Sequence, residues 1–321
     1  MRAVVVSADK RLHFADVAEP TALPSDVIID VKAISLNRGE VRQTRTFRPE
    51  GYRPGWDIAG VVVKEADRAP GAAYGTFGKG PALGSRVVGL LPTAAWAERV
   101  AVPANSVAVL PDNVSFAQAA TLPVAALTAL GCLDKRGANL LGRRVLITGA
   151  TGGVGHFATQ LARLSGAHVV AAVRSETGAE YATRFGAHEV AIVGNEPAQA
   201  GKLGPYDLIL DSVGGASAGA SMNMLAPAGV CVLFGGSSGL DANFNVQSFY
   251  FSGGASVFGY VLFRELECGE TASIGFKRIL PLLSSGALTA DIALERPWAE
   301  IDAVAEELMN RSYTGKAVLH L

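Results

Sequence analysis

Cysteine is scarce in this chain: Cys132, Cys231 and Cys268 are its three cysteines among 321 residues. An odd, widely spaced set forms neither a disulfide framework nor the C-x-x-C pair of a metal site. We therefore expect a reducing, cytoplasmic location, in which each cysteine is a small buried or partly buried residue.

Charge of one sign and long apolar runs are lacking as well. The 28 Lys and Arg residues nearly balance 29 Asp and Glu, which gives no support for a nucleic-acid or anionic-membrane partner. The uncharged stretch 212–240 is interrupted by glycines, serines, Asn223 and Pro227, so it lacks the unbroken apolar run of a membrane-spanning helix. The N-terminal Met1–Val6 has no long apolar core or cleavage site, and we expect a first strand there rather than a signal peptide.

Glycine is abundant, and its densest useful stretch lies near the middle of the chain. The apolar run Val145–Ile147 enters a glycine-rich turn, a helical pattern follows, and a second apolar run occupies Val169–Val173. This order within about 30 residues is typical of a parallel βαβ unit. Such a turn lets the backbone approach a pyrophosphate, and the helix N-terminus supplies free N–H groups. The sequence thus predicts a dinucleotide site, with turn residues Gly149, Thr151, Gly152, Gly153, Val154 and Gly155.

The remaining patterns divide the chain into two parts. Short apolar or alternating runs separated by Gly and Pro fill residues 1–120 and indicate a β-rich domain, with a surface loop at 67–84. From 144 to 259 strand and helix patterns alternate, which predicts a doubly wound parallel sheet that binds ligand at the carboxyl ends of its strands. The final run Lys316–Leu321 is expected to rejoin the β-rich part.

Six motifs along nearly the whole chain are similar to those of one family. They are Ser35–Glu40, Pro54–Val62, Leu122–Leu130, Gly149–Gly155, Leu210–Gly215 and Thr314–Leu319. With them the chain resembles the zinc-independent, zeta-crystallin-like quinone oxidoreductases of the medium-chain dehydrogenase/reductase superfamily. The resemblance implies an α/β protein with a GroES-like β-barrel catalytic domain, a Rossmann domain, an active site between them, and a homodimer. We place the GroES-like domain at 1–115 and 262–321, and the Rossmann domain at 116–261.

A catalytic zinc can be tested against the motifs, because it needs three Cys, His or carboxylate ligands. Zinc-bearing relatives carry a Cys in a first loop and Gly-His-Glu in a second. The matching stretches here are Leu36–Arg38 and Gly55–Asp57, with neither Cys nor His, and the five histidines have no ligand spacing. We therefore predict no metal. The glycine turn also fits short-chain reductases, but no tyrosine here has the lysine four residues later that those enzymes use.

The choice of cofactor depends on the end of the second strand of the βαβ unit. An acidic residue there binds the ribose hydroxyls of NAD, whereas a cation binds the 2′-phosphate of NADP. Arg174 follows the strand directly and Ser175 comes next, although Glu176 lies two residues beyond Arg174. We interpret Arg174 and Ser175 as NADP(H)-binding, with a solvated surface arginine as the alternative. Many relatives carry Lys where this chain has Gly178, and Arg311 matches an arginine near the cofactor in similar enzymes.

The resemblance also implies roles for single residues. Asn37 resembles the asparagine beside the nicotinamide ribose and the substrate carbonyl, with an ordinary turn residue as the alternative. Thr128 resembles a threonine near the nicotinamide, with a helix-interior hydroxyl bonded to the preceding turn as the alternative. Further residues expected beside the cofactor are Val213, Phe234, Gly235 and Gly236.

Aromatic residues supply the remaining candidates. Tyr52 is a candidate proton donor, and Trp56 a candidate for the substrate pocket, though either could equally be a core aromatic. Tyr250 and Tyr260 are weaker candidates for the same pocket.

Three functions fit the sequence. The first is NADPH-dependent reduction of a quinone or an α,β-unsaturated carbonyl, a small-molecule substrate. The second is reduction of an enoyl thioester on CoA or a carrier protein, which the basic residues Arg42, Arg45, Arg48 and Arg53 keep open. The third is a non-enzymatic NADPH-binding structural or sensor protein.

Overall fold

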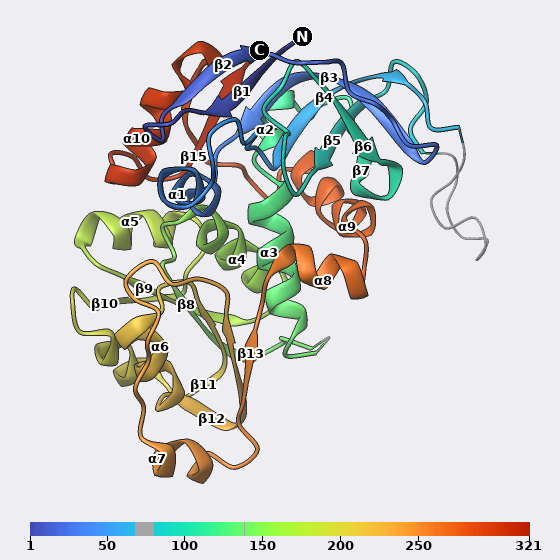
Figure 1. Ribbon diagram of the computed structural model, residues 1–321. Coiled ribbons are helices and arrows are strands. Elements are labelled where there is room, and N and C mark those ends of the chain that lie inside the picture. The colour runs from blue at the N-terminus through green and yellow to red at the C-terminus, as the bar shows by residue number, and fades with distance from the viewer. Residues whose placement is uncertain (68–79, 138) are drawn as a thin grey trace. The chain divides into compact units, whose positions relative to one another are not determined.

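The computed structural model describes residues 1–67, 80–137 and 139–321, and it forms two compact units (Figure 1). Unit 1 comprises Met1–Leu127 and Leu266–Leu321, and unit 2 comprises Thr128–Glu265. The sequence placed the boundaries at 115/116 and 261/262. The first boundary differs because α2 (Phe116–Ala120) packs on strands of unit 1. Most of the surface loop expected at 67–84 lies outside the described residues.

Unit 1 is built on two sheets. β1 (Arg2–Val6) and β2 (Leu12–Asp16) form an antiparallel pair. The second sheet has seven strands in the order β14-β15-β3-β4-β5-β7, and β6 also pairs with β3. Its strands are β3 (Asp26–Ser35), β4 (Asp57–Lys64), β5 (Arg86–Leu90), β6 (Arg99–Pro103), β7 (Val107–Val109), β14 (Ile292–Pro297) and β15 (Lys316–His320). The last strand therefore pairs with β3 of the N-terminal part, which confirms the predicted return of the chain.

Helices of unit 1 include one that the sequence did not predict. Residues 38–46 form α1, where only Glu40, Val41 and Thr44 are buried, so its apolar stripe is too narrow to stand out. The others are α2, the start of α3 (Pro123–Asp134), the end of α8 (Leu262–Cys268), α9 (Ala272–Ser284) and α10 (Ile301–Asn310). Ser115 caps α2 in a capping box with Gln118, which satisfies two backbone N–H groups at its first turn.

The core of unit 1 forms because β3 alternates. Val27, Ile29 and Val31 point to one side and are buried together with the fully buried Trp96. Each such side chain contributes about 1.5–3 kcal/mol by leaving water. This core fixes β3 and its neighbours, and hence the ends of these strands.

Unit 2 contains one fully parallel six-stranded sheet in the order β10-β9-β8-β11-β12-β13. Its strands are β8 (Arg144–Thr148), β9 (His168–Val173), β10 (Glu189–Ile192), β11 (Tyr206–Asp211), β12 (Leu225–Leu233) and β13 (Ser256–Gly259). The chain runs outward from β8 to β10 and then returns to the other side of β8, so the topological switch point lies between β8 and β11. The predicted doubly wound sheet is confirmed, and ligands of such sheets bind at the carboxyl ends beside the switch point.

The crossover helices of unit 2 cover this sheet. α4 (Gly153–Leu164) packs on β8 and β9, α5 (Glu176–Arg184) on β9 and β10, and α6 (Gly215–Met222) on β11 and β12. The uncharged stretch 212–240 supplies α6 and β12. Among the described residues, no helix combines the length and the apolar character needed to cross a bilayer.

Two of the three cysteines are buried, as the sequence predicted. Cys132 and Cys231 are buried, and burial raises the pKa of both thiols. Cys268, which we expected to be at least partly buried, is exposed near the end of α8.

Candidate functional site

The glycine turn between β8 and α4 is tightly packed backbone. Gly149 has φ +61°, a left-handed conformation that favours glycine. A Cβ on Gly155 would overlap the carbonyl oxygen of Gly149 and lie 2.7 Å from Cα of Ala150. A Cβ on Gly152 would meet only the Gly149 oxygen, at 3.3 Å. The turn thus needs glycine at 149 and 155 to close, while Gly152 faces open space at the N-terminus of α4.

Open space at that terminus suits an anion. The first N–H groups of α4 have no partner four residues earlier, and they carry the positive end of the helix dipole. Thr151, Gly153 and Val154 belong to the same turn. The structure therefore brings the six predicted turn residues together at the carboxyl end of β8, next to the switch point. This arrangement fits the pyrophosphate of a dinucleotide.

The turn after β9 lies beside the glycine turn. Gly178, in the first turn of α5, would place a Cβ 3.4 Å from Cγ2 of Thr151. Ser175 caps α5 by accepting the N–H of Gly178 at 3.3 Å. Arg174 is exposed, and its side chain makes no hydrogen bond or ion pair with any residue that the structure describes. A guanidinium without a partner in the described part of the chain therefore follows β9, beside the glycine turn, where an adenosine 2′-phosphate could accept its hydrogen bonds.

Asp211, at the end of β11, organises this edge of the sheet, and sequence reasoning gave it no role. Its carboxylate accepts hydrogen bonds from the N–H of Val213 at 3.1 Å and of Gly214 at 2.7 Å, and from the hydroxyls of Thr148 at 3.1 Å and Ser217 at 2.6 Å. A buried carboxylate is stable only with such partners. The sequence feature that could have indicated this role of Asp211 is an acidic residue at the end of an apolar strand.

Phe234, Gly235 and Gly236 follow β12 and pack on the Ser212–Gly214 loop. The Phe234 N–H donates to the Asp211 carbonyl oxygen at 3.0 Å, and a Cβ on Gly235 would lie 3.1 Å from the carbonyl carbon of Ser212. The predicted residues at the ends of β8, β11 and β12, Val213 included, therefore form one contiguous edge. Close packing between these neighbouring loops is by itself a sufficient reason for glycine at these positions.

Thr128 in α3 is buried, yet none of the hydrogen bonds among the described residues uses its hydroxyl. A bond from this hydroxyl to the preceding turn is therefore not found, and the role of Thr128 beside the nicotinamide stays a prediction. Tyr260 is buried against α3, because a Cβ on Gly131 would overlap the Tyr260 hydroxyl. Tyr250 is 59% exposed on α7 (Val246–Phe251), which enters β13 from its amino end. That edge is opposite the glycine turn, so unit 2 does not bring Tyr250 near it.

In unit 1 the side chain of Asn37 lies in a buried polar cluster. Its Nδ2 donates to Oδ2 of Asp57 at 2.8 Å, and its Oδ1 accepts from Nζ of Lys316 at 2.8 Å. Lys316 also donates to the Leu36 carbonyl oxygen at 3.1 Å and lies 3.6 Å from Asp57 Oδ2. The other oxygen of Asp57 accepts the Val124 N–H at 3.0 Å. Sequence reasoning chose Asn37 and missed its two charged partners.

Glu40 completes the cluster from α1. Both of its carboxyl oxygens are buried and make no hydrogen bond of good geometry with the described residues, although Asn37 lies near enough to lower the pKa of this carboxyl slightly. Burial, reinforced by the charge of Asp57, holds the pKa of Glu40 well above its usual range. Burial also raises the pKa of Asp57, against the opposing effect of Lys316, and lowers the pKa of Lys316. We infer a neutral Glu40 beside an Asp57–Lys316 ion pair.

Glu40 should therefore make stability depend on pH. An unfolded chain ionises this carboxyl near pH 4.5, whereas burial raises its pKa in the folded chain, so the folded state loses relative stability as pH rises from 4.5 toward the raised pKa. Glu40→Gln removes the titration. We expect its melting temperature, relative to wild type, to rise by a few degrees between pH 4.5 and pH 8 in thermal unfolding. A difference that stays constant across this range would contradict a raised pKa.

Tyr52 and Trp56 shortly precede Asp57 in the sequence, and their side chains have different surroundings. The Tyr52 hydroxyl accepts from Thr93 Oγ1 at 2.9 Å, and the Arg48 guanidinium stacks 4.3 Å from the centre of its ring. The Trp56 ring lies against α1, where a Cβ on Gly39 would be 3.5 Å from it. Both side chains are half-buried, so neither is a pure core aromatic.

Arg311, the other predicted cofactor residue, is exposed at the end of α10 in unit 1, in a left-handed conformation with φ +59°. Its side chain makes no hydrogen bond or ion pair with the described part of the chain. Its role toward a cofactor stays a prediction.

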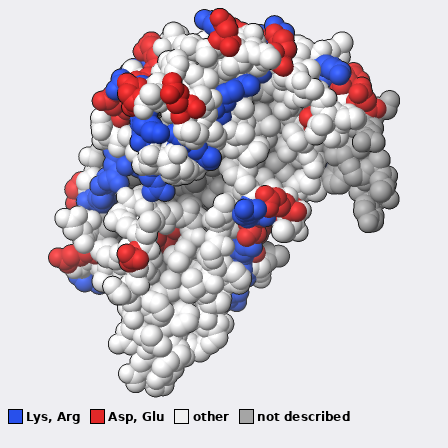
Figure 2. All heavy atoms as spheres, in the orientation of Figure 1, with Lys and Arg blue, Asp and Glu red and all other residues white. Residues whose placement is uncertain are grey.

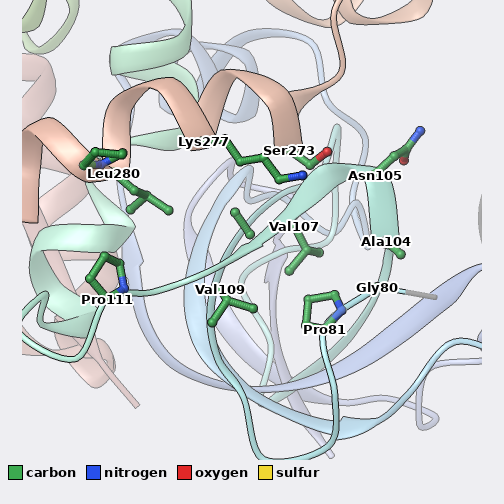
Figure 3. A pocket seen from close by; sticks show the side chains of 12 residues that line it. Gly80, Pro81, Ala104, Asn105, Val107, Val109, Pro111, Ser273, Lys277 and Leu280 are labelled. Atoms are coloured by element: carbon green, nitrogen blue, oxygen red, sulfur yellow. The ribbon is translucent and has the colours of Figure 1, made fainter. Parts of the chain in front are cut away.

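A separate groove of about 470 Å³ in unit 1 lies between β7 and α9 (Figure 3). Val107 and Val109 line one side, and Ser273, Lys277 and Leu280 the other. None of the residues that line it was predicted as a site residue. Within residues 1–67, 80–137 and 139–321, no three His, Cys, Asp or Glu side chains group as metal ligands.

Comparison with known proteins agrees with this geometry. Residues 153–274 match the family described as zinc-binding dehydrogenase. A quinone oxidoreductase from Thermus thermophilus, solved by itself and in complex with NADPH, has a TM-score of 0.82 at 29% identity, with 100% of both chains covered. A mycobacterial quinone oxidoreductase has a TM-score of 0.87 at 25% identity, again over 100% of both chains.

A relative found by sequence is a 2-methylene-furan-3-one reductase from Solanum lycopersicum, 34% identical over 206 residues. The match covers 62% of this chain and 53% of the relative, so the chain spans about half the length of that protein. Taken with the two sheets and the glycine turn, these matches show that the chain is similar in fold and sequence to the quinone oxidoreductases of the medium-chain dehydrogenase/reductase superfamily.

Proposed function

We propose that this protein is an NADPH-dependent oxidoreductase that reduces a quinone or an α,β-unsaturated carbonyl without a metal ion. The observation that carries the proposal is the glycine turn with the guanidinium of Arg174 beside it, which is unpaired among the residues that the structure describes. The solved relative from Thermus thermophilus supports NADPH as the cofactor. The tomato relative supports the substrate class, because a 2-methylene-3-one is an α,β-unsaturated ketone.

Bound NADPH would supply the hydride; the chain would supply position and charge. The α4 N-terminus binds the pyrophosphate through backbone N–H groups, and Arg174 binds the 2′-phosphate. Asn37 has one Nδ2 hydrogen beyond the one given to Asp57. Donated to a carbonyl oxygen, that hydrogen stabilises negative charge developing there. Tyr52 or water is the proposed proton donor.

The thioester alternative depended on a free basic surface. Arg45 instead donates to Asp302 at 2.8 Å, and Arg48 donates to Gln43 and stacks on Tyr52. Two of the four arginines that suggested it are therefore engaged inside unit 1. We favour the free quinone or enone for this reason.

The test is NADPH oxidation with a panel of quinones, enones and enoyl thioesters, repeated after dialysis against a strong chelator. The proposal predicts turnover of a quinone or enone that the chelator leaves unchanged. Tight NADPH binding without turnover of any compound would instead favour the non-enzymatic alternative, and loss of turnover on chelation would refute metal independence.

We further propose that the protein is a homodimer that pairs through β13. This strand ends the parallel sheet, so one of its edges has no partner within unit 2. Apolar side chains are exposed around it, with Val257 at 41%, Phe258 at 40% and Phe251 at 72%. The space-filling view shows the α7 end of unit 2 without charged side chains (Figure 2). An uncharged apolar edge strand is suited to pairing with a second copy.

A lysine at Val257 should disrupt that pairing, because two copies would place like charges along the shared edge. We expect light scattering after gel filtration to give a dimer mass for wild type and a monomer mass for Val257→Lys. Leu23→Lys is the matched control, since Leu23 is 65% exposed in unit 1. A wild-type monomer, or a Val257→Lys dimer, would rule out this interface.

A further inference from the structure

The Asn37 cluster stands out because its members are far apart in sequence and are held by topology. Antiparallel pairing of β15, β3 and β4 aligns Val318 with Ser35 and Ser35 with Asp57. The start of β15, the end of β3 and the start of β4 therefore lie side by side. Lys316, the segment leading to Asn37, and Asp57 meet there, although Asn37 and Lys316 are 279 residues apart.

Asn37 does not use its side chain as an asparagine at a helix start usually does. It occupies the N-cap position of α1, yet its side chain accepts no backbone N–H of that helix. Both ends of the amide are instead held by Asp57 and Lys316. Asp57 is fully buried and Lys316 is 4% exposed, whereas Asn37 is partly exposed. The buried pair thus holds the member of the cluster that can reach a ligand.

The chemistry of this pair permits only one orientation of the amide. An ammonium group donates and cannot accept, while a carboxylate accepts and cannot donate. A flipped Asn37 would point its NH₂ at Lys316 and its oxygen at Asp57, so both contacts would become repulsive. The orientation of the amide is therefore fixed by its partners.

We propose that Asp57 and Lys316 are positioning residues that lock the Asn37 amide, so that Asn37 meets its ligand only as a hydrogen-bond donor. The inference rests on the proposed function for the identity of that ligand, a carbonyl oxygen or a ribose hydroxyl. Lys316 adds a second effect, because its charge on Oδ1 polarises the amide and strengthens the remaining N–H as a donor.

The first test measures solvent exchange of the Asn37 side-chain amide and does not depend on enzymatic activity. In ¹⁵N NMR of the full chain, the Asn37 side-chain NH₂ signals, assigned by their loss in Asn37→Asp, should be protected from solvent exchange in wild type. Lys316→Met should raise their exchange rate at least tenfold. Lys32→Met is the matched control, because Lys32 forms an exposed ion pair with Asp30 in the same unit. Unchanged exchange in Lys316→Met would overturn the proposal.

The second test asks whether Lys316 acts through Asn37. Lys316→Met and Asn37→Ala should each lower kcat tenfold or more, and the double variant should lose no more than Asn37→Ala alone. Losses that multiply would overturn the inference. Asp57→Asn combined with Lys316→Met removes both charges together; it should melt close to wild type and still show the fast Asn37 exchange.

The two tests separate the two claims. Wild type without turnover would count against the proposed function, while the exchange measurement would still decide whether Asp57 and Lys316 hold Asn37.

Discussion

Replacing Gly155 with alanine is expected to lower the melting temperature by about 3–10 °C and to abolish measurable NADPH binding. The added methyl would overlap the Gly149 carbonyl oxygen and lie 2.7 Å from Cα of Ala150. These atoms are backbone and cannot rotate away, so the start of α4 must move off β8. That movement displaces the N–H groups proposed to bind pyrophosphate. Thermal unfolding and the fluorescence of bound NADPH measure the two effects.

Gly152→Ala is the matched control for this steric argument. Its methyl would meet a single atom at 3.3 Å, and Gly152 has φ −81°, which any residue adopts. We expect the melting temperature to stay within a degree or two of wild type, while NADPH affinity falls because the methyl faces the proposed phosphate. Equal destabilisation by Gly152→Ala and Gly155→Ala would show that the close packing at 155 is not what matters.

Arg174→Ala is expected to weaken NADPH binding about 10- to 100-fold and to leave NADH binding nearly unchanged. A charge-assisted hydrogen bond to phosphate contributes about 1.5–3 kcal/mol, and Arg174 has no partner among the described residues that could compete for it. Titration of the two cofactors, followed by protein fluorescence, gives the ratio directly.

The control for Arg174→Ala is Arg143→Ala, which removes the same charge from the opposite edge of the sheet. Arg143 precedes β8 and pairs with Asp207 at 3.0 Å. Its loss should change both affinities by less than twofold, because exposed charges interact weakly over such distances. Similar losses of NADPH and NADH affinity in Arg174→Ala would mean that the arginine does not recognise the 2′-phosphate.

The sequence predicted the central strands of unit 2 well because β8, β9 and β11 are almost entirely buried. The apolar runs Val145–Ile147 and Val169–Val173 lie within β8 and β9. Several other elements were missed for the opposite reason. α1, α7 and β14 are mostly polar or exposed, so burial leaves little pattern in their sequence.

The site residues also fall into two groups, those that are close together in the sequence and those that only strand pairing brings together. The glycine turn and Arg174 lie within 30 residues of one βαβ unit, and steric limits on a strand–helix turn are local, so the sequence alone determined them. The surroundings of Asn37 were decided by tertiary structure. Lys316 and Asp57 reach it only because antiparallel strands place the start of one beside the end of the next. A buried charge needs a partner, and no local pattern says which distant residue will supply it.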